Sequence, residues 1–177
     1  MLDDKGLTEA DYVLRDELID ELDATSHEKK SITNMLVQWH KGWSKVVNAG
    51  QKRFNLMRRL QEADDEGYCQ CCCTGQWIHY TKLDAGHYIP ATKQPTRFHP
   101  LNVWPQSKAS NSHGFGNKDE RKYTLFMQEK FGWDIIDTLH ALSEEKGFTW
   151  RDHKKELIFR RIGWERSIKD HKKRLGV

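Results

Sequence analysis

The chain has 177 residues, a formal net charge of +3 and a mean hydropathy of −0.86. This length suffices for one core of ordinary size, and no apolar run approaches the ~20 residues that span a bilayer, which excludes an integral membrane protein built on helices. The acidic N-terminus lacks the apolar segment of a secretory signal, so we expect a protein that works in the cytoplasm.

The first third of the chain has the apolar spacing of helices. Residues 8–24 predict one helix, with Thr8 as its N-cap and acidic side chains in its first turn. Residues 31–63 predict a second helical stretch. Gly42 and Gly50 are weak points in it, so one bent helix or two helices would fit.

The middle of the chain has a different composition. Residues 67–117 hold all the prolines and all the cysteines, which is typical of short strands and ordered loops. Strands are expected at 77–80 and 85–89. The helical spacing returns over 118–147, as one or two helices, and a last helix is expected over 149–175, capped by its first residue.

Charge is unevenly spread along the chain. Residues 1–28 hold ten acidic residues and two basic ones, whereas residues 146–177 hold eleven Lys or Arg and four acidic residues. This asymmetry indicates a basic surface for a polyanion and an acidic end that avoids it, although two solvated helical faces would give the same pattern. A further hypothesis is that the acidic end covers the basic face and inhibits the protein.

The four cysteines, Cys69, Cys71, Cys72 and Cys73, lie within five residues. Adjacent thiols cannot join distant parts of a fold, so the pattern favours a reducing compartment, with metal binding or burial as the role of the thiols.

One segment carries the residue types of phosphodiester hydrolysis. Asp84 and His87 lie on or beside one predicted strand, Asn102 follows, and Asn111 and His113 precede a helix. A histidine can deprotonate water near neutral pH, and a carboxylate with an amide or imidazole can hold a hard divalent ion.

The order of these motifs resembles the NinG (Rap) recombination endonucleases of lambdoid bacteriophages, a branch of the HNH nuclease superfamily. The matching residues are Cys69 and Cys72, Ala85 to Tyr88, Arg97-Phe98, Asn102-Val103, Asn111 with His113, and Gly116-Asn117. The resemblance is expected to cover roughly residues 40–140 and to leave out 1–35 and 148–177.

By this resemblance His87 is the general base, and Asn102 orients it through the backbone or a loop. Asn111 is a metal ligand, and Asp84 is the second ligand, although many HNH proteins place that ligand directly before the base. His113 is a reserve ligand or a phosphate contact. The alternatives are a turn-forming role for Asp84 and a helix cap for Asn111.

Further residues are assigned to DNA. Arg97 is expected to hold the scissile phosphate, against the alternative of a structural salt bridge. The expected contacts to the DNA backbone, which could equally be solvated lysines and arginine, are Lys108, Lys118, Arg121 and Lys122.

The family's second Cys-x-x-Cys is replaced here by Ser107-Lys108-Ala109-Ser110. Serine hydroxyls do not replace thiolates on zinc, so a structural Zn²⁺ at Cys69 and Cys72 is not expected, unless His79 or His99 completes the site.

The sequence and the resemblance together predict an α+β fold, mostly helical, with a small ββα-metal core between helices. The expected division is a helical region over 1–66, a nuclease core over 67–125 and basic helices over 126–177. The expected function is DNA cleavage with one Mg²⁺ or Mn²⁺ on branched recombination intermediates, such as Holliday junctions or D-loops, by a homodimer. The alternatives are a sequence-specific or nicking HNH enzyme and a non-catalytic DNA-binding recombination factor.

Overall fold

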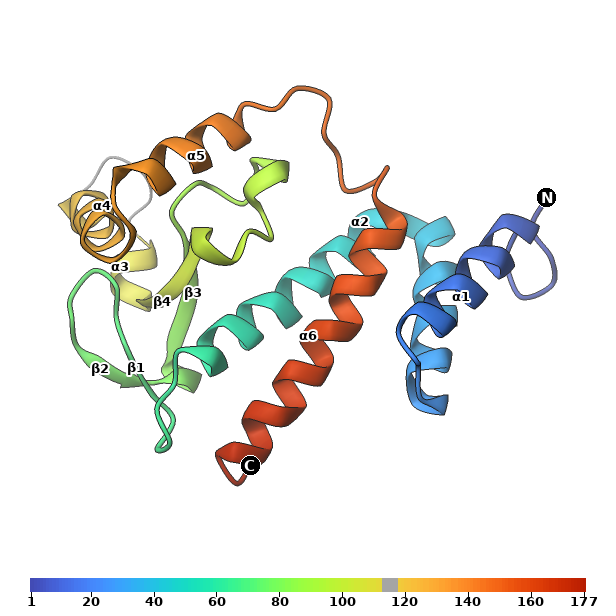
Figure 1. Ribbon diagram of the computed structural model, residues 1–177, viewed down its shortest axis with the longest axis horizontal. Coiled ribbons are helices and arrows are strands. Elements are labelled where there is room, and N and C mark those ends of the chain that lie inside the picture. Colours follow the sequence, from blue (N-terminus) through green and yellow to red (C-terminus); the bar gives the residue numbers. More distant parts are fainter. Residues whose placement is uncertain (113–117) are drawn as a thin grey trace. The chain divides into compact units, whose positions relative to one another are not determined.

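The computed structural model describes residues 1–112 and 118–177, and it confirms the α+β class with a large helical majority (Figure 1). The helices are α1 (Glu9–Glu21), α2 (Ser26–Gln61), α3 (Lys108–Ser112), α4 (Lys118–Phe131), α5 (Trp133–Ser143) and α6 (Lys154–Arg174). The strands are β1 (Tyr68–Gln70), β2 (Trp77–His79), β3 (Leu83–His87) and β4 (Val103–Ser107). Single 3₁₀ turns occupy Tyr80–Lys82, Gln94–Thr96 and Pro100–Asn102. None of the described helices combines the length and the apolarity needed to cross a membrane.

The chain folds into two compact units. Unit 1 contains residues 1–53 and 150–166, and unit 2 contains residues 54–149 and 167–177. Both long helices, α2 and α6, therefore contribute to both units. The three-region division expected from the sequence stays a prediction.

In unit 1 the predicted N-cap of α1 is confirmed. The Thr8 hydroxyl accepts a hydrogen bond from the Asp11 backbone N–H, while the Asp11 carboxylate accepts from the Thr8 backbone N–H. These two bonds satisfy donors that the first helical turn leaves without partners. The predicted weak point at Gly42 is also confirmed, because its backbone is non-helical inside α2.

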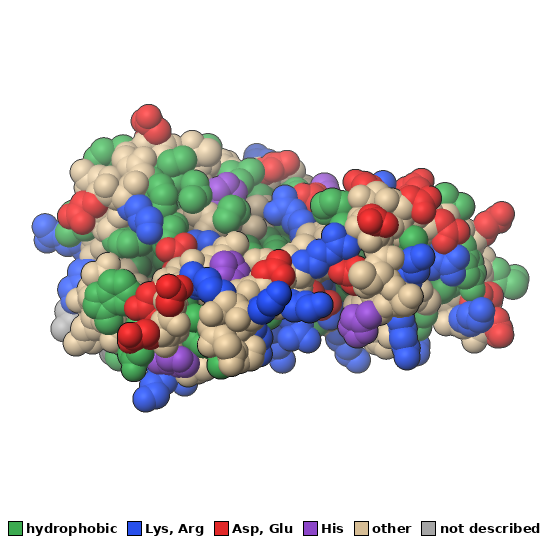
Figure 2. All heavy atoms as spheres, turned by 60° about the horizontal axis from the view of Figure 1, so that its bottom comes forward, with side chains coloured by type: hydrophobic (Ala, Val, Ile, Leu, Met, Phe, Trp, Pro, Cys, Tyr) green, Lys and Arg blue, Asp and Glu red, His purple; other side chains and the backbone are tan. Residues whose placement is uncertain are grey.

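The acidic N-terminal segment and the basic helix α6 form ion pairs with each other in unit 1. Lys154 contacts Asp11 at 2.6 Å, and Arg166 contacts Glu28 at 2.7 Å. Lys155 lies 3.2 Å from the carboxylates of both Glu17 and Glu21. Acidic side chains accordingly lie among basic ones on the face shown in Figure 2. Some of the acidic residues near the N-terminus and some of the basic residues of α6 therefore neutralise each other within unit 1.

Asp11 is the buried centre of this network. Its side chain is fully buried and contacts Lys154, His40 Nε2 at 2.7 Å and the Thr8 hydroxyl at 2.6 Å. Burial alone would raise the pKa of Asp11, but the hydrogen bonds from Lys154, Thr8 and His40 outweigh it and hold that pKa well below its ordinary value. The charged carboxylate thus joins α1, α2 and α6.

The Asp11→Asn substitution is expected to lower the free energy of unfolding by about 2–3 kcal/mol. The loss should be smaller than that for breaking a wholly buried ion pair, because the side chains of Lys154 and His40 are partly exposed. The Asp16→Asn variant, an exposed carboxylate of the same helix, serves as the control and should change stability by under ~0.5 kcal/mol. Urea unfolding at neutral pH measures both. Since the pKa of Asp11 is depressed, the difference between wild type and Asp11→Asn should shrink as the pH falls below about 4. Equal stability of the two variants at pH 7 would contradict this role.

Unit 2 contains two antiparallel two-stranded sheets. β1 pairs with β2, and β3 pairs with β4 in a regular register from Leu83 opposite Ser107 to His87 opposite Val103. The end of α2 is fastened to the second sheet, because Arg58 donates to the Val103 carbonyl at 3.1 Å and Arg59 donates to the Leu83 carbonyl at 2.6 Å. Figure 1 shows α5 beside the segment that connects β3 and β4, which it contacts at Gln94–Thr96.

Two expectations about element boundaries were wrong. The strand expected at 85–89 is β3, which begins and ends two residues earlier, at Leu83 and His87. The last helix begins at Lys154 and not at Thr149, because the chain first makes a turn in which the His153 backbone N–H donates to the carbonyl of the buried Trp150.

Candidate functional site

His87 is the last residue of β3, and its ring is held by the loop that follows. Its Nε2 lies 3.1 Å from the carbonyl oxygen of Arg97. A carbonyl can only accept, so Nε2 carries the proton and Nδ1 is the basic nitrogen of the neutral ring. Burial lowers the pKa of His87, and the positive charge of Arg97 adds to this effect, although the hydrogen bond to the carbonyl opposes it. The ring is therefore neutral near pH 7.

Asn102 fixes the loop that supplies this carbonyl. Its side chain is fully buried, and its Oδ1 accepts from the Ile89 backbone N–H at 2.7 Å. Its Nδ2 donates to the carbonyls of Ile89 at 2.9 Å and Thr96 at 3.0 Å. One amide thus ties both ends of the segment between Ile89 and Thr96, directly before Arg97. This geometry fits the expected role, in which Asn102 orients His87 through a loop.

Asp84 and Asn111 come from different elements and meet. The Asn111 amide, on α3, lies 3.1 Å from Asp84 Oδ2, on β3. Asp84 is half-buried and Asn111 is exposed, so solvent reaches the pair. Carboxylate and amide oxygens are ligands that Mg²⁺ and Mn²⁺ accept. The donor types of this pair therefore fit the divalent ion that the resemblance implies.

The candidate base and the candidate ligand project from opposite faces of β3. Asp84 lies opposite Gln106, and His87 lies opposite Val103. Side chains alternate along a strand, so residues three apart point to opposite faces, separated by about 10 Å along the strand. Asp84 faces α3, whereas His87 faces the loop that carries Arg97. A phosphodiester that contacts both must lie along the edge of β3.

The residue before His87, Gly86, is packed closely against the side chain of Gln106, which would have to move to admit any other residue. A Cβ atom on Gly86 would overlap Oε1 of the buried Gln106. The Gly86 carbonyl also accepts a hydrogen bond at 2.9 Å from the hydroxyl of Tyr123, a buried residue of α4. These contacts fix the backbone of β3 directly before the candidate base.

Arg97 forms its hydrogen bond to His87 through its backbone carbonyl. Its guanidinium lies 5.6 Å from the centre of the Phe98 ring, and burial lowers its pKa. Of the residues expected on the DNA backbone, Lys108, Arg121 and Lys122 are exposed, and Lys122 contacts Asp119 at 3.1 Å. The expected role of these residues in DNA binding stays a prediction.

Several expected residues lie wholly or partly outside the described residues. His113, Gly116 and Asn117 belong to the segment that the structure does not describe, and the side chain of Lys118, at the start of α4, is not described either. Among residues 1–112 and 118–177, no group of three or more His, Cys, Asp or Glu side chains is placed to hold a metal ion.

The four cysteines are buried, and they face different neighbours. Cys69 Sγ donates to the Arg59 carbonyl at 3.2 Å, and burial raises the pKa of Cys69 to about 12. Cys72 and Cys73 have their sulfur atoms 3.8 Å apart. The sulfur of Cys71 accepts a hydrogen bond from the backbone N–H of Ser107 at 3.2 Å.

The two serines that replace the family's second thiol pair bond to each other. The Ser107 hydroxyl donates to the Ser110 hydroxyl at 3.0 Å, and the Ser110 backbone N–H donates to the Ser107 hydroxyl at 3.2 Å. Hydrogen bonds therefore occupy both serines.

Sequence reasoning missed three residues that position the site: Tyr123, Gln106 and the backbone of Arg97. Tyr123 lies in the stretch 118–147, for which the sequence indicated only helical spacing. A buried tyrosine needs a partner for its hydroxyl, which was a usable signal. Gly86 beside a histidine in a strand likewise indicates a close approach of other atoms. The Arg97 carbonyl left no signal, since every residue has one.

Comparison with known proteins identifies one family. The family model described as "Bacteriophage Lambda NinG protein" matches residues 15–173. No curated protein and no solved structure gives a match. The match extends well beyond the expected range of about 40–140, so the expectation that residues 1–35 and 148–177 fall outside the resemblance was wrong for residues 15–35 and 148–173. By this match, over nearly its whole length, the chain belongs to the NinG family.

Proposed function

We propose that this protein is an HNH-type DNA endonuclease that cleaves phosphodiester bonds with one Mg²⁺ or Mn²⁺. The observation that carries the proposal is the contact between Asn111, on α3, and Asp84, on β3, the strand that ends in the neutral His87. Bound to these two side chains, the divalent ion would neutralise charge on the phosphate and stabilise the leaving oxygen. Membership of the NinG family supports the proposal, because the motifs around His87 resemble those of the NinG recombination endonucleases.

Each side chain has a defined part in the proposed reaction. Nδ1 of His87 takes a proton from the attacking water, while the hydrogen bond from Nε2 to Arg97 stabilises the imidazolium that forms. Asp84 and Asn111 would hold the metal ion, with His113 as the reserve ligand. The cleavage leaves a 5′-phosphate and a 3′-hydroxyl. Branched recombination intermediates are the proposed substrate.

End-labelled Holliday junction, Y-fork and linear duplex, incubated with Mg²⁺, Mn²⁺ or EDTA, test this function. Metal-dependent cleavage of the branched substrates supports it, and a His87→Ala protein purified in parallel controls for contaminating nuclease. A defined cut in linear duplex would instead indicate a sequence-specific or nicking enzyme. Tight binding without any cleavage would indicate a DNA-binding recombination factor.

The cleavage rate should depend on pH through His87. The neutral ring is the active base, so the rate should rise with pH and become constant once His87 is deprotonated. Because burial lowers the pKa of His87 below about 6.5, the plateau should begin below pH 7. Single-turnover rates from about pH 5 to pH 8, at saturating metal, give the apparent pKa. An apparent pKa above 7 would contradict the assignment of the base.

The Asp84→Asn substitution should raise the metal concentration that gives half the maximal rate by about tenfold or more, because even residues that only support metal ligands change metal affinity about 10–100-fold. The exposed Asp137, on α5, supplies the control variant Asp137→Asn, which removes the same charge from the same unit. Cleavage rates over a series of Mn²⁺ concentrations measure the effect. If both variants need the same metal concentration as the wild type, Asp84 is not a ligand.

A further inference from the structure

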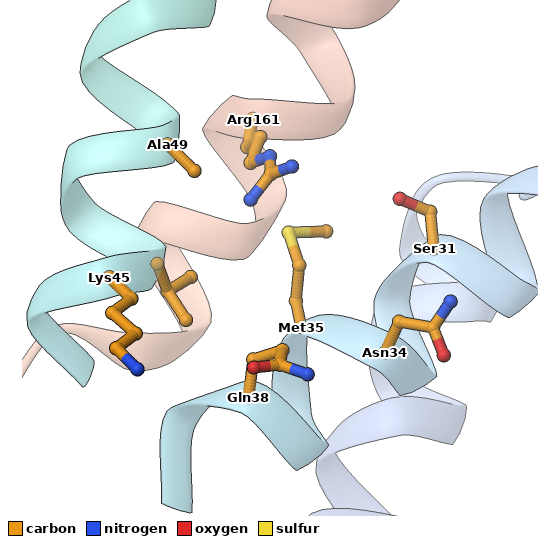
Figure 3. A pocket seen from close by; sticks show the side chains of 8 residues that line it. Ser31, Asn34, Met35, Gln38, Lys45, Ala49 and Arg161 are labelled. Carbon is orange, nitrogen blue, oxygen red and sulfur yellow. The ribbon is translucent and has the colours of Figure 1, made fainter. Parts of the chain in front are cut away.

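Unit 1 contains a pocket that the proposed reaction does not use. Its volume is about 360 Å³, and it lies at the bend of α2 (Figure 3). It is lined by Ser31, Asn34, Met35, Gln38, Lys45, Val46, Ala49 and Arg161. The first seven come from the two sides of Gly42 in α2, and Arg161 comes from α6. Pockets of this size take small organic ligands or single residues of a larger molecule.

The pocket combines an apolar surface with unused amide groups. Met35 and Val46 are buried apart from small exposed areas, and in Figure 3 the Met35 side chain points across the hollow toward Arg161. Asn34 and Gln38 are exposed, and within the described part of the chain their amides form no hydrogen bond. Each amide offers a donor and an acceptor on one planar group. An occupant with a flat apolar face and a polar edge would satisfy both features.

The charge around the pocket is positive. From Lys29 to Arg53 the chain carries six Lys or Arg residues and no Asp or Glu. Lys45 forms no ion pair with any described residue, and Arg161 shares the single carboxylate of Glu165, at 3.4 Å, with Arg53, at 3.6 Å. The cations of the pocket therefore exceed its anions, which favours an anionic occupant.

A nucleotide has all three properties. A base has a flat apolar face that packs against side chains, and asparagine or glutamine amides bond to base edges. Its phosphate is an anion that lysine and arginine hold. A base inside a duplex hides its face by stacking, so only an unpaired nucleotide could enter the pocket.

We propose that this pocket binds one unpaired nucleotide of a DNA strand, with the base against Met35 and Val46 and the phosphate near Lys45 and Arg161. This inference rests on the proposed function, since it takes DNA as the substrate, and it adds a reason for a preference for branched DNA. Forks and D-loops expose unpaired bases that a linear duplex lacks.

Binding of fluorescent oligonucleotides to the full-length protein in EDTA tests the proposal without cleavage. The variants are Lys45→Ala with Gln38→Ala, combined in one protein, and Lys41→Ala as a control that removes an equal charge from α2 outside the pocket. The pocket variant should bind single-stranded DNA and a fork about tenfold more weakly, with duplex binding unchanged. Lys41→Ala should leave the affinities for single-stranded DNA, fork and duplex unchanged. Thermal unfolding checks that both variants are folded.

Two results would overturn the proposal. One is an equal loss of DNA affinity in the pocket variant and in Lys41→Ala, and the other is a loss of affinity for duplex as large as that for single-stranded DNA. Either would show only a general effect of charge. Competition adds a second test. Deoxyadenosine monophosphate should displace the single strand from the wild type, whereas inorganic phosphate at the same concentration should not. Equal displacement by phosphate would exclude recognition of the base, and a mononucleotide that binds as tightly as the oligonucleotide would make the ligand a free nucleotide. Pocket-dependent binding in a protein that cleaves nothing would support the pocket while the proposed function fails.

Discussion

The His87→Ala substitution is expected to slow DNA cleavage by about 10²–10⁴-fold, the usual contribution of a general base. Nδ1 is the basic nitrogen because Nε2 donates to the Arg97 carbonyl, and the lowered pKa keeps the ring neutral at pH 7. Without the ring, the attacking water keeps its proton. The proposal assigns the metal ion to Asp84 and Asn111 and not to His87, so the metal concentration for half-maximal rate should not change.

Single-turnover cleavage at saturating Mn²⁺ measures this effect, with His27→Ala, an exposed histidine of α2, as the matched control. The control should cleave as fast as the wild type. DNA binding by the His87→Ala protein in EDTA should equal that of the wild type, which separates loss of chemistry from loss of affinity. A His87→Ala protein that keeps a tenth or more of the wild-type rate would show that His87 is not the base.

The Asn102→Ala substitution is expected to lower the free energy of unfolding by about 3–4 kcal/mol. It leaves the Ile89 N–H, the Ile89 carbonyl and the Thr96 carbonyl without their partner, and each buried group that loses its hydrogen bond costs about 1–3 kcal/mol. Some of this cost is regained if water enters the space. Cleavage should fall as well, because the loop that presents the Arg97 carbonyl to His87 is no longer fixed.

Urea unfolding measures the change in stability, and Asn111→Ala is the matched control for the loss of an amide. Asn111 is exposed, so that variant should lose under ~0.5 kcal/mol of stability, although the proposal expects it to need more metal. A loss below ~1 kcal/mol for Asn102→Ala would show that the loop does not depend on this side chain.

Much of the helical fold follows from local patterns. Apolar spacing predicted helices in the regions of α1, α2, α4 and α5, and the capping pair Thr8 and Asp11 identified the start of α1. The start of α6 was mistaken because Thr149 is a good capping residue by its chemistry. Its context differs, since the buried Trp150 lies in a turn that precedes the helix. The burial of Trp150 thus outweighed the capping preference of Thr149.

The strands were harder to predict. β1 has only three residues, too few to show an alternation. β4 contains Pro105, which argues against a central strand. The proline is tolerated because β4 belongs to a two-stranded sheet, and its carbonyl accepts a hydrogen bond from the Cys72 N–H at 2.9 Å.

The candidate site was partly visible in the sequence. The meeting of Asp84 and Asn111, expected as joint ligands, appears in the structure at 3.1 Å. Asn102 was expected to orient His87 through a loop, but the atom that contacts the ring was not predicted. It is the backbone carbonyl of Arg97, and the path of a loop determines which carbonyl reaches a ring. The placement of His113 lies outside the described residues.

The close packing over Gly86 limits how this site can change in evolution. Many HNH proteins carry a metal ligand directly before the base, but here any side chain at that position would collide with Gln106. Substitutions at Gly86 should therefore be destabilising, whatever side chain they introduce, because Gln106 would have to move and its amide also donates to Cys73 at 3.1 Å. If Asp84 is the metal ligand that we propose, a change to the commoner arrangement is thus coupled to a change at Gln106.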